Sequence, residues 1–250
     1  MMDPLKASIV KAWDRGVEDY DELVAHGRLT RTEADAWKVV LGRLLPPPPS
    51  KILEVGAGTG VMSLLLAELG HTVTATDISK GMLDEARRKA SERRLAIAFE
   101  IADAELLPFG EKSFDAVFGR HILWTLPHPD RALGEWHRVL RPGGRLVLVD
   151  SLAVPPSVGG RLQRTASDLL LRLRRPSGTG HRYTAQVHAA LPLVGNSDPA
   201  RYTDLIRGAG FELTGTESLD RLKELESKAM PLAERWHAQD RKYAFTARRP

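Results

Sequence analysis

A strand, a glycine-rich turn and a helix start follow one another from Lys51, and this combination constrains the fold more than any other part of the chain. The letters are KILEVGAGTG, followed by the apolar run VMSLLLAEL. Gly56, Gly58 and Gly60 allow positive φ angles and leave no Cβ where the backbone meets a ligand. Dinucleotide sites prefer G-x-G-x-x-G, whereas here the spacing is G-x-G-x-G behind the acidic Glu54. The turn therefore predicts a nucleoside-bearing cofactor and disfavours NAD.

Two later segments each bring an acidic residue to a strand end. Residues 71–79 are β-branched and contain Asp77, as expected of a second parallel strand that delivers a carboxylate to the C-terminal edge of the sheet, where it would accept both ribose hydroxyls. Residues 98–105 predict a third short strand that ends in Asp103. A helix N-cap at Asp77 and a turn residue at Asp103 are the structural alternatives. Their joint occurrence after successive strands favours ligand binding.

Residues 114–121 predict a fourth strand, and residues 140–150 a helix end, a Pro-Gly-Gly turn and a fifth strand. With these signals the segment from about Lys51 to Asp150 resembles the class I S-adenosylmethionine-dependent methyltransferases that act on small molecules. The resemblance implies an α/β fold: a Rossmann-like, doubly wound, seven-stranded sheet whose last strand is antiparallel. It also implies S-adenosyl-L-methionine as cofactor.

The resemblance assigns the nucleoside end of that cofactor to the strands just described. It implies that Asp77 binds the ribose and that Ile78 and Met82 lie near the adenine. Asp103 and the amide of Ala104 are expected at the adenine edge.

The methionine end is expected between the first and fourth strands. The resemblance places Gly56 near it, together with the backbone of Gly119 or Arg120. Glu54 is expected to support the glycine turn and, through water, the methionine ammonium group. The predicted cofactor-binding residues are Glu54, Gly56, Ala57, Gly58, Gly60, Asp77, Ile78, Met82, Asp103, Ala104, Gly119 and Arg120.

The residues before the glycine turn predict a helical cap. Residues 7–21 and 30–45 read as helices, and Thr30 with an acidic residue three positions later forms a capping-box pattern. Trp13 and Tyr20 have two readings, packing of an amphipathic helix or, by resemblance to methyltransferases with an aromatic N-terminal helix, a wall of the active site. On the second reading Tyr20 is a candidate catalytic residue.

The segment after the fourth strand supplies candidate substrate contacts. In open α/β sheets ligands lie beyond the carboxyl ends of the strands, so Arg120, His121 and Trp124 are expected to face the methyl donor. His121 is the main catalytic candidate; its structural alternatives are to cap the strand or to hold the methionine end of the cofactor. Trp136 and His137 are interpreted as structural, because the other face of their helix must pack on the sheet.

An insertion follows the fifth strand. Leucines and Ala166 share one face of a helix over residues 162–173, while arginines line the other, so this is a basic amphipathic helix. A solvated surface helix, a lid that attracts an anionic substrate and a membrane-surface helix are its three readings. Tyr183 and His181 are expected to reach the substrate from above. No metal site is predicted, because the histidines lack carboxylates at ligand spacing.

Composition limits the partners. The net charge is +4, and its Lys and Arg residues are spread out, so nucleic acid is not required. Without cysteine there is no thiolate chemistry, and the longest apolar runs fall short of a bilayer span, so we expect a cytoplasmic enzyme, monomeric or homodimeric. The expected divisions are a helical cap at 1–45, the cofactor-binding core at 46–158, a helical lid at 159–197 and the rest of the core sheet at 198–250.

The sequence thus predicts a methyltransferase that moves a methyl group to a small-molecule acceptor by in-line displacement. There are two alternatives. One is an RNA or quinone/lipid-type methyltransferase that uses the basic helix, and the other is a non-catalytic protein that binds S-adenosylmethionine. A catalytic base is required only if the acceptor must lose a proton during attack, so the sequence leaves open whether oxygen, nitrogen, carbon or sulfur is methylated.

Overall fold

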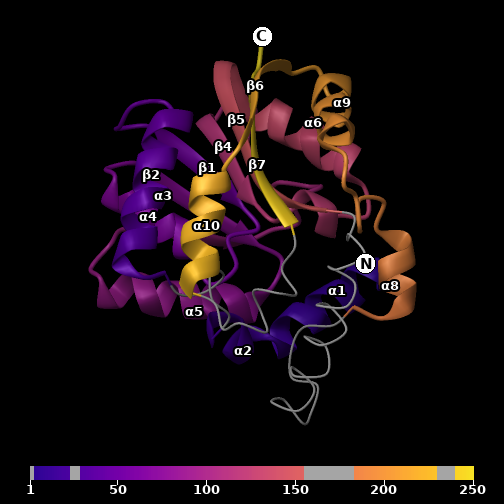
Figure 1. Ribbon diagram of the computed structural model, residues 1–250, viewed down its shortest axis with the longest axis horizontal. Helices are drawn as coiled ribbons and strands as arrows, with labels where there is room; N and C mark the ends of the chain where they lie inside the picture. The colour runs from indigo at the N-terminus through magenta and orange to yellow at the C-terminus, as the bar shows by residue number, and fades with distance from the viewer. Residues whose placement is uncertain (1–2, 23–28, 155–182, 230–239) are drawn as a thin grey trace.

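The computed structural model describes residues 3–22, 29–154, 183–229 and 240–250 (Figure 1). Its helices are α1 (Pro4–Arg15), α2 (Val17–Glu22), α3 (Arg31–Leu44), α4 (Val61–Glu68), α5 (Lys80–Glu92), α6 (Pro129–Val139), α8 (Ala185–Ala190), α9 (Pro199–Gly208) and α10 (Asp220–Ala229), with the 3-10 turn η1 (Leu123–Thr125). Its strands are β1 (Lys51–Val55), β2 (Thr72–Asp77), β3 (Ile97–Ile101), β4 (Phe114–Arg120), β5 (Leu140–Ala153), β6 (Glu212–Ser218) and β7 (Asp240–Arg248).

The strands form one seven-stranded sheet in the order β3-β2-β1-β4-β5-β7-β6. The first five strands are parallel, and β7 runs antiparallel between β5 and β6. This is the predicted doubly wound sheet with an antiparallel last strand. The order reverses between β1 and β4, and in open α/β sheets ligands bind beyond the carboxyl ends of the strands at such a point.

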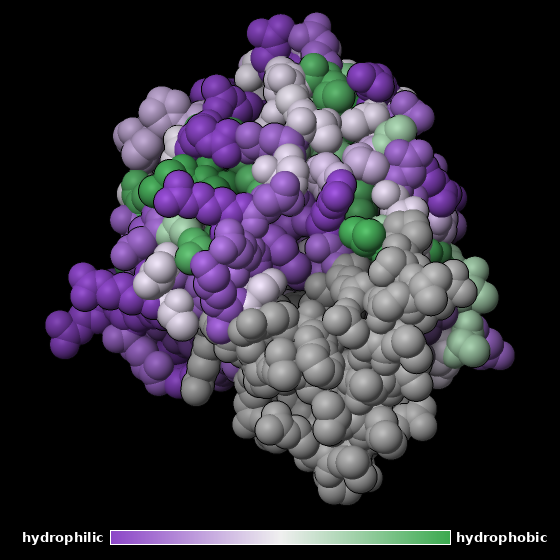
Figure 2. Space-filling view, viewed as in Figure 1, coloured by the Kyte–Doolittle hydropathy of each residue, from purple (hydrophilic) through white to green (hydrophobic). Residues whose placement is uncertain are grey.

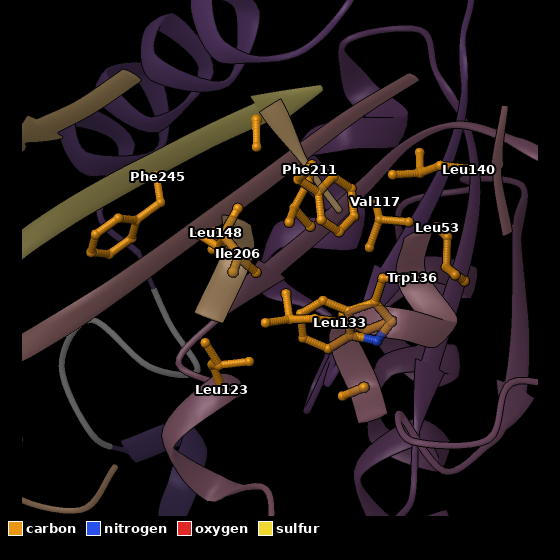
Figure 3. Close-up of a cluster of buried hydrophobic side chains, with 14 of the residues drawn as sticks. Leu53, Val117, Leu123, Leu133, Trp136, Leu140, Leu148, Ile206, Phe211 and Phe245 are labelled. Atoms are coloured by element: carbon orange, nitrogen blue, oxygen red, sulfur yellow. The ribbon is translucent and has the colours of Figure 1, made fainter. Parts of the chain in front are cut away.

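Helices cover both faces of the sheet, and the strands alternate their side chains between two apolar clusters. Leu53 points into one cluster with Trp136 of α6 and Ile206 of α9 (Figure 3). Its neighbour Ile52 packs in the other, with residues of α3, α4 and α10 such as the fully buried Trp37. Trp136 is therefore structural, as predicted, and its indole N–H donates to the carbonyl oxygen of Ala104 at 3.0 Å.

The predicted capping box at Thr30 is confirmed, whereas the helix predicted over residues 7–21 differs from the structure. The hydroxyl of Thr30 accepts from the Glu33 amide at 3.3 Å, and the Glu33 carboxylate accepts from the Thr30 amide at 2.6 Å. The single helix expected over residues 7–21 is two helices, because Gly16 ends α1 by donating its amide to the carbonyl of Trp13 at 3.0 Å. The division of the chain into four parts stays a prediction, although α3 packs in the core and only α1 and α2 lie over the strand ends (Figure 1).

The face of the molecule seen in Figure 2 is largely polar. Figure 2 shows hydrophilic residues over most of the coloured area, with hydrophobic ones in small separate groups. Within the described ranges, no helix has both the length and the apolar character needed to cross a membrane.

Candidate active site

The glycine turn joins β1 to α4 beside the point where the strand order reverses. Gly56, Gly58 and Gly60 have φ angles of 67°, 55° and 81°, so all three need the left-handed conformation that glycine adopts without strain. Gly60 is also the N-cap of α4. The positive φ angles expected from the sequence are confirmed.

Packing adds a reason for glycine that the sequence did not reveal. A Cβ on Gly56 would lie 2.6 Å from Cδ1 of Ile122, and one on Gly119 would lie 2.7 Å from Cγ2 of the same side chain. At these two positions the missing Cβ makes room for Ile122. At Gly58 the Cβ would lie 3.7 Å from Cε1 of Tyr20, in ordinary van der Waals contact with the ring. Tyr20 therefore lies against the glycine turn.

Asp77 ties the end of β2 to the glycine turn. Its Oδ2 accepts the amide of Gly58 at 2.8 Å, and its Oδ1 accepts the amide of Ser79 at 2.9 Å. Burial raises the pKa of this carboxyl, and the amide donors partly oppose the shift. A carboxylate has about four lone-pair positions, so Asp77 keeps capacity to accept ribose hydroxyls. The turn, its acidic neighbour and the position at the sheet edge fit a nucleoside-bearing cofactor.

Asp103 lies two residues beyond β3, so the strand ends earlier than predicted. Its Oδ1 accepts the Glu105 amide at 2.9 Å, and its Oδ2 lies 2.5 Å from Nζ of Lys6 in α1. The turn reading of Asp103 is thus realised in the structure, and the carboxylate retains lone pairs for a ligand. Met82, expected near the adenine, is 1% exposed, so its side chain offers little surface to any ligand.

Glu54 is buried beneath the turn, with 2% of its surface exposed. It accepts a hydrogen bond from the hydroxyl of Ser63 in α4. Burial raises the pKa of Glu54 to about 7, against the opposing effects of the Ser63 hydroxyl and the Arg120 charge. Glu54 therefore supports the turn from the protein side, by holding β1 to α4.

Three contacts that sequence reasoning missed hold α1 and α2 against these loops. The hydroxyl of Ser79 donates to Asp14 at 2.5 Å, and that of Thr59 donates to Asp21 at 2.6 Å. The third is the Lys6 contact at Asp103. Each joins residues 38 or more positions apart, so no local pattern signals it.

Aromatic side chains from four segments contact one another near the turn. Trp13 of α1 contacts Tyr20 of α2 edge to face, with ring centroids 5.9 Å apart, and Tyr183 at 6.1 Å. Trp124 of η1 lies 6.2 Å from Tyr183, which is 7% exposed. We call Trp13, Tyr20, Trp124 and Tyr183 the aromatic cluster. Both readings of Trp13 and Tyr20 are compatible with this cluster, because the two rings pack on each other and Tyr20 also lies against Gly58.

His121 follows the last residue of β4 and has a φ angle of +57°, uncommon for a residue with a side chain. Its Nδ1 lies 3.2 Å from Oδ1 of Asp150 in β5, and its side chain is 17% exposed. Burial, reinforced by the charges of Lys242 and Arg120, lowers its pKa well below 6.5. His121 is therefore a neutral imidazole at pH 7, a form that can accept a proton.

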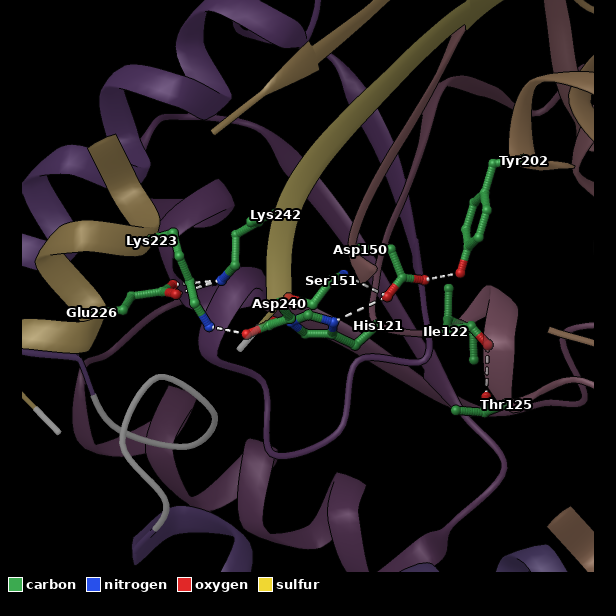
Figure 4. A network of polar contacts seen from close by, with 10 residues as sticks. All are labelled: His121, Ile122, Thr125, Asp150, Ser151, Tyr202, Lys223, Glu226, Asp240 and Lys242. Carbon is green, nitrogen blue, oxygen red and sulfur yellow. Dashed lines mark hydrogen bonds and ion pairs between the residues drawn. The ribbon is translucent and has the colours of Figure 1, made fainter. Parts of the chain in front are cut away.

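Charged side chains surround this histidine at the C-terminal edge of the sheet (Figure 4). Lys242 of β7 and Glu226 of α10, exposed by 2% and 1%, form a salt bridge at 2.5 Å. The Lys242 ammonium and the Arg120 guanidinium lie 5.3 and 5.6 Å from the centroid of the Trp37 ring. The side chain of Arg120 thus packs on α3, whereas the sequence assigned this residue to the cofactor through its backbone.

Some predicted residues lie outside the described ranges, namely His181 and the arginines of the basic helix. Among the residues that the structure does describe, no group of three or more His, Asp or Glu is arranged to hold a metal ion.

Comparison with known proteins places these features in a family. Residues 53–148 match the family model described as a methyltransferase domain. A demethylmenaquinone methyltransferase of Clavibacter sepedonicus is 34% identical over 181 residues, which cover 70% of this chain and 71% of that protein. A demethylmenaquinone methyltransferase of Thermus thermophilus is 40% identical over 122 residues, which cover 48% of this chain and 56% of that protein.

Solved structures share the fold at low identity. Phosphoethanolamine N-methyltransferase 2 of Haemonchus contortus, in complex with S-adenosyl-L-methionine, has a TM-score of 0.66 and 18% identity over 95% of this chain and 57% of that one. The [4+2]-cyclase SpnF has a TM-score of 0.63 and 21% identity, and the match covers 98% of this chain and 94% of that one. The matched domain and the relatives show that the chain belongs to the class I S-adenosylmethionine-dependent methyltransferases and is an enzyme.

Proposed function

We propose that this methyltransferase transfers the methyl group to a ring carbon of a quinone-type acceptor in its reduced, dihydroxy form. The observation that carries the proposal is the aromatic cluster, whose rings come from α1, α2, η1 and the residue two positions before α8. These rings contact one another in a chain that reaches Gly58 through Tyr20. Aromatic side chains bind flat apolar rings through stacked and edge-to-face contacts. Relatives named for demethylmenaquinone, and one from Bordetella avium named a ubiquinone/menaquinone C-methyltransferase at 36% identity over 118 residues, support this acceptor class.

The cofactor-binding roles proposed for this chain follow from the contacts above. Asp77 would accept the ribose hydroxyls while its amide contacts keep it at the turn. Asp103 would accept from the adenine edge, with Lys6 neutralising its charge. The remaining cofactor positions expected from the sequence stay predictions. S-Adenosylmethionine, when bound, supplies a methyl group on a positively charged sulfur that leaves as a neutral thioether.

The residues of the chain then have two tasks in carbon methylation. The first is to hold the acceptor ring with its nucleophilic carbon in line with the methyl group, which we assign to the aromatic cluster, with Trp124 and Tyr183 as substrate-binding residues and Tyr20 at the reacting edge. The second is to remove a proton from the ring hydroxyl, because the resulting oxyanion raises the electron density of the neighbouring ring carbon. We assign this task to His121, a neutral imidazole after β4.

A test uses isotope-labelled methyl donor and a panel of acceptors: a reduced naphthoquinone with an unsubstituted ring carbon beside a hydroxyl, a catechol and a primary amine. We expect label on the ring carbon of the first, located by NMR of the product. Turnover with the catechol oxygen or the amine alone would overturn the acceptor class.

The role of His121 is tested by His121→Asn, because asparagine tolerates the positive φ angle better than alanine does. We expect kcat to fall by about 100-fold while cofactor affinity is retained. A full kcat in this variant would remove His121 from the mechanism. The cytoplasmic location and the monomeric or dimeric state expected from the sequence stay predictions.

A further inference from the structure

The side chain of Asp150 contacts three polar groups at the C-terminal end of β5 (Figure 4). Its Oδ1 accepts the amide of Ser151 at 2.8 Å and faces Nδ1 of His121 at 3.2 Å. Its Oδ2 accepts the hydroxyl of Tyr202 in α9 at 2.8 Å. Asp150 is 2% exposed and Tyr202 is 1% exposed.

A buried carboxylate at this place is costly unless its hydrogen bonds serve a purpose. An apolar side chain would pack β5 against α9 without that cost, so anchoring alone does not account for an acid. An ionised carboxylate accepts hydrogen bonds only. It therefore requires His121 to carry its proton on Nδ1, which makes Nε2 the unprotonated ring nitrogen.

We propose that Asp150 is a positioning residue for His121: it accepts the Nδ1 proton, so that Nε2 is the proton acceptor in methyl transfer, and Tyr202 holds the carboxylate in place. This rests on the role of His121 given under Proposed function. It adds two residues that come from β5 and α9, both outside the residues expected to contact the cofactor or the acceptor.

The proton balance of the step is simple. The O–H bond of the acceptor hydroxyl breaks, and its electron pair stays on the oxygen. A bond forms between that proton and Nε2 of His121, giving an imidazolium ion whose charge faces Asp150. The ring carbon then forms a bond to the methyl group, while the bond between that methyl group and sulfur breaks and leaves its electron pair on the neutral thioether. The ring C–H bond breaks, its proton returns through solvent to the oxygen, and the imidazolium releases its proton to solvent, so one proton is released for each methyl group transferred. No oxidant or reductant is consumed.

The charges around His121 and Asp150 set the pH range in which Asp150 is ionised and His121 is neutral. Burial raises the pKa of Asp150 to about 7, against the Tyr202 hydrogen bond, the Ser151 amide and Lys242, and with Asp240 adding to the rise. His121 faces Lys242 and Arg120, which lower its pKa, and Glu226 and Asp240, which raise it. Below pH 7 a protonated Asp150 can donate to Nδ1, and the arrangement is lost.

The first experiment observes the tautomer without turnover. Long-range nitrogen–proton NMR of the labelled full-length protein at pH 8 reports which ring nitrogen of each histidine carries the proton, and His121→Asn identifies the signal. We expect His121 to be held in the Nδ1-protonated form. In Asp150→Asn we expect a mixture of tautomers, because an amide offers both a donor and an acceptor. The same single tautomer in both proteins would overturn the proposal.

The second experiment measures kcat against pH. The wild-type profile is expected to rise through about pH 7, the pKa of Asp150. Tyr202→Phe removes a hydrogen bond that favours ionised Asp150, so the rise should move to higher pH by about one pH unit while the plateau is kept. Asp150→Asn should lower the plateau by about 100-fold. Tyr243→Phe, a tyrosine paired with Asp150 across β5 and β7, is the control and should leave the profile in place.

These outcomes separate the inference from the proposed acceptor. The NMR experiment needs no acceptor, and the pH profile can be recorded with any acceptor that the panel identifies. If ring-carbon methylation is found and His121→Asn is inactive, but Tyr202→Phe and Asp150→Asn keep the wild-type profile, the proposed function stands and the positioning role is wrong. Should Asp150→Asn not fold, the displaced profile of Tyr202→Phe decides the question.

Discussion

The ammonium group of Lys6 lies between the carboxylates of Asp103 and Glu105, 2.5 Å from the first and 2.6 Å from the second. This bridge joins α1 to the loop after β3, where the adenine end of the cofactor is proposed to bind. The Lys6 side chain is 14% exposed, and the hydrogen bonds that it donates to the two carboxylates raise its pKa against the effect of burial. The cap thus contacts the proposed cofactor site through a charged group.

Removal of this bridge should loosen the cap. In Lys6→Met we expect hydrogen exchange of the amides from Trp13 to Tyr20 to be faster by about tenfold, because α1 loses a partly buried ion pair. Lys11→Met, an exposed lysine on the same helix, is the matched control. In the wild type, S-adenosylhomocysteine should slow exchange in the same segment. Protection confined to residues 54–60 would mean that the cap is fixed packing.

Asp77→Asn should weaken the binding of S-adenosylmethionine by a few kcal/mol, because the charged acceptor for the ribose hydroxyls becomes a neutral amide. Calorimetry measures this loss, and NAD should not bind either protein. Asp84→Asn, an exposed acid on α5, is the control for a change in charge alone. Unchanged affinity in Asp77→Asn would show that the ribose binds elsewhere.

The buried Glu54 should make stability depend on pH. Its folded-state pKa of about 7 lies above the ordinary glutamate value of 4.5 expected in the unfolded chain. Between these pH values the folded protein binds more protons than the unfolded chain, so stability from this group is lost as pH rises. Glu54→Gln should therefore gain stability relative to the wild type between pH 5 and 8, by on the order of 2 kcal/mol.

Urea denaturation at several pH values measures that difference. Glu92→Gln, an exposed acid at the end of α5, should run parallel to the wild type. A constant difference between Glu54→Gln and the wild type from pH 5 to 8 would contradict a raised pKa for Glu54.

Two glycines should respond in opposite ways to alanine. Gly60 has a φ of +81°, and a Cβ there would lie 2.8 Å from that of Ala86, so Gly60→Ala should lower the free energy of unfolding by more than about 1 kcal/mol. Gly42 lies within α3 with no atom within 4 Å of its Cβ position, so Gly42→Ala should raise it by about 0.5–1 kcal/mol. Thermal unfolding of both variants tests the pair; stabilisation by Gly60→Ala would contradict the strained turn.

Much of the cofactor region could be predicted from the sequence by itself, because its signals are local. Positive φ at three glycines, the capping box at Thr30 and acids after β2 and β3 each depend on residues a few positions apart. Such preferences hold wherever the segment packs. Asp150 carried the same signal, an acid near the end of a parallel strand, and was not recognised as a site residue.

The partners of the buried polar groups were decided only by the tertiary structure. His121 meets Asp150 because β4 pairs with β5, and Lys242 reaches the same edge because β7 enters the sheet beside β5. The Tyr202 hydroxyl bonds to an acid 52 positions away. A buried charge is tolerated only where another group pairs with it or forms a hydrogen bond to it. The strand order brings distant segments together and thereby determines which group becomes that partner. The sequence alone therefore determined the glycine turn and the individual strands, and the family resemblance implied their sheet. The pairing of the strands in that sheet decided which side chains lie together.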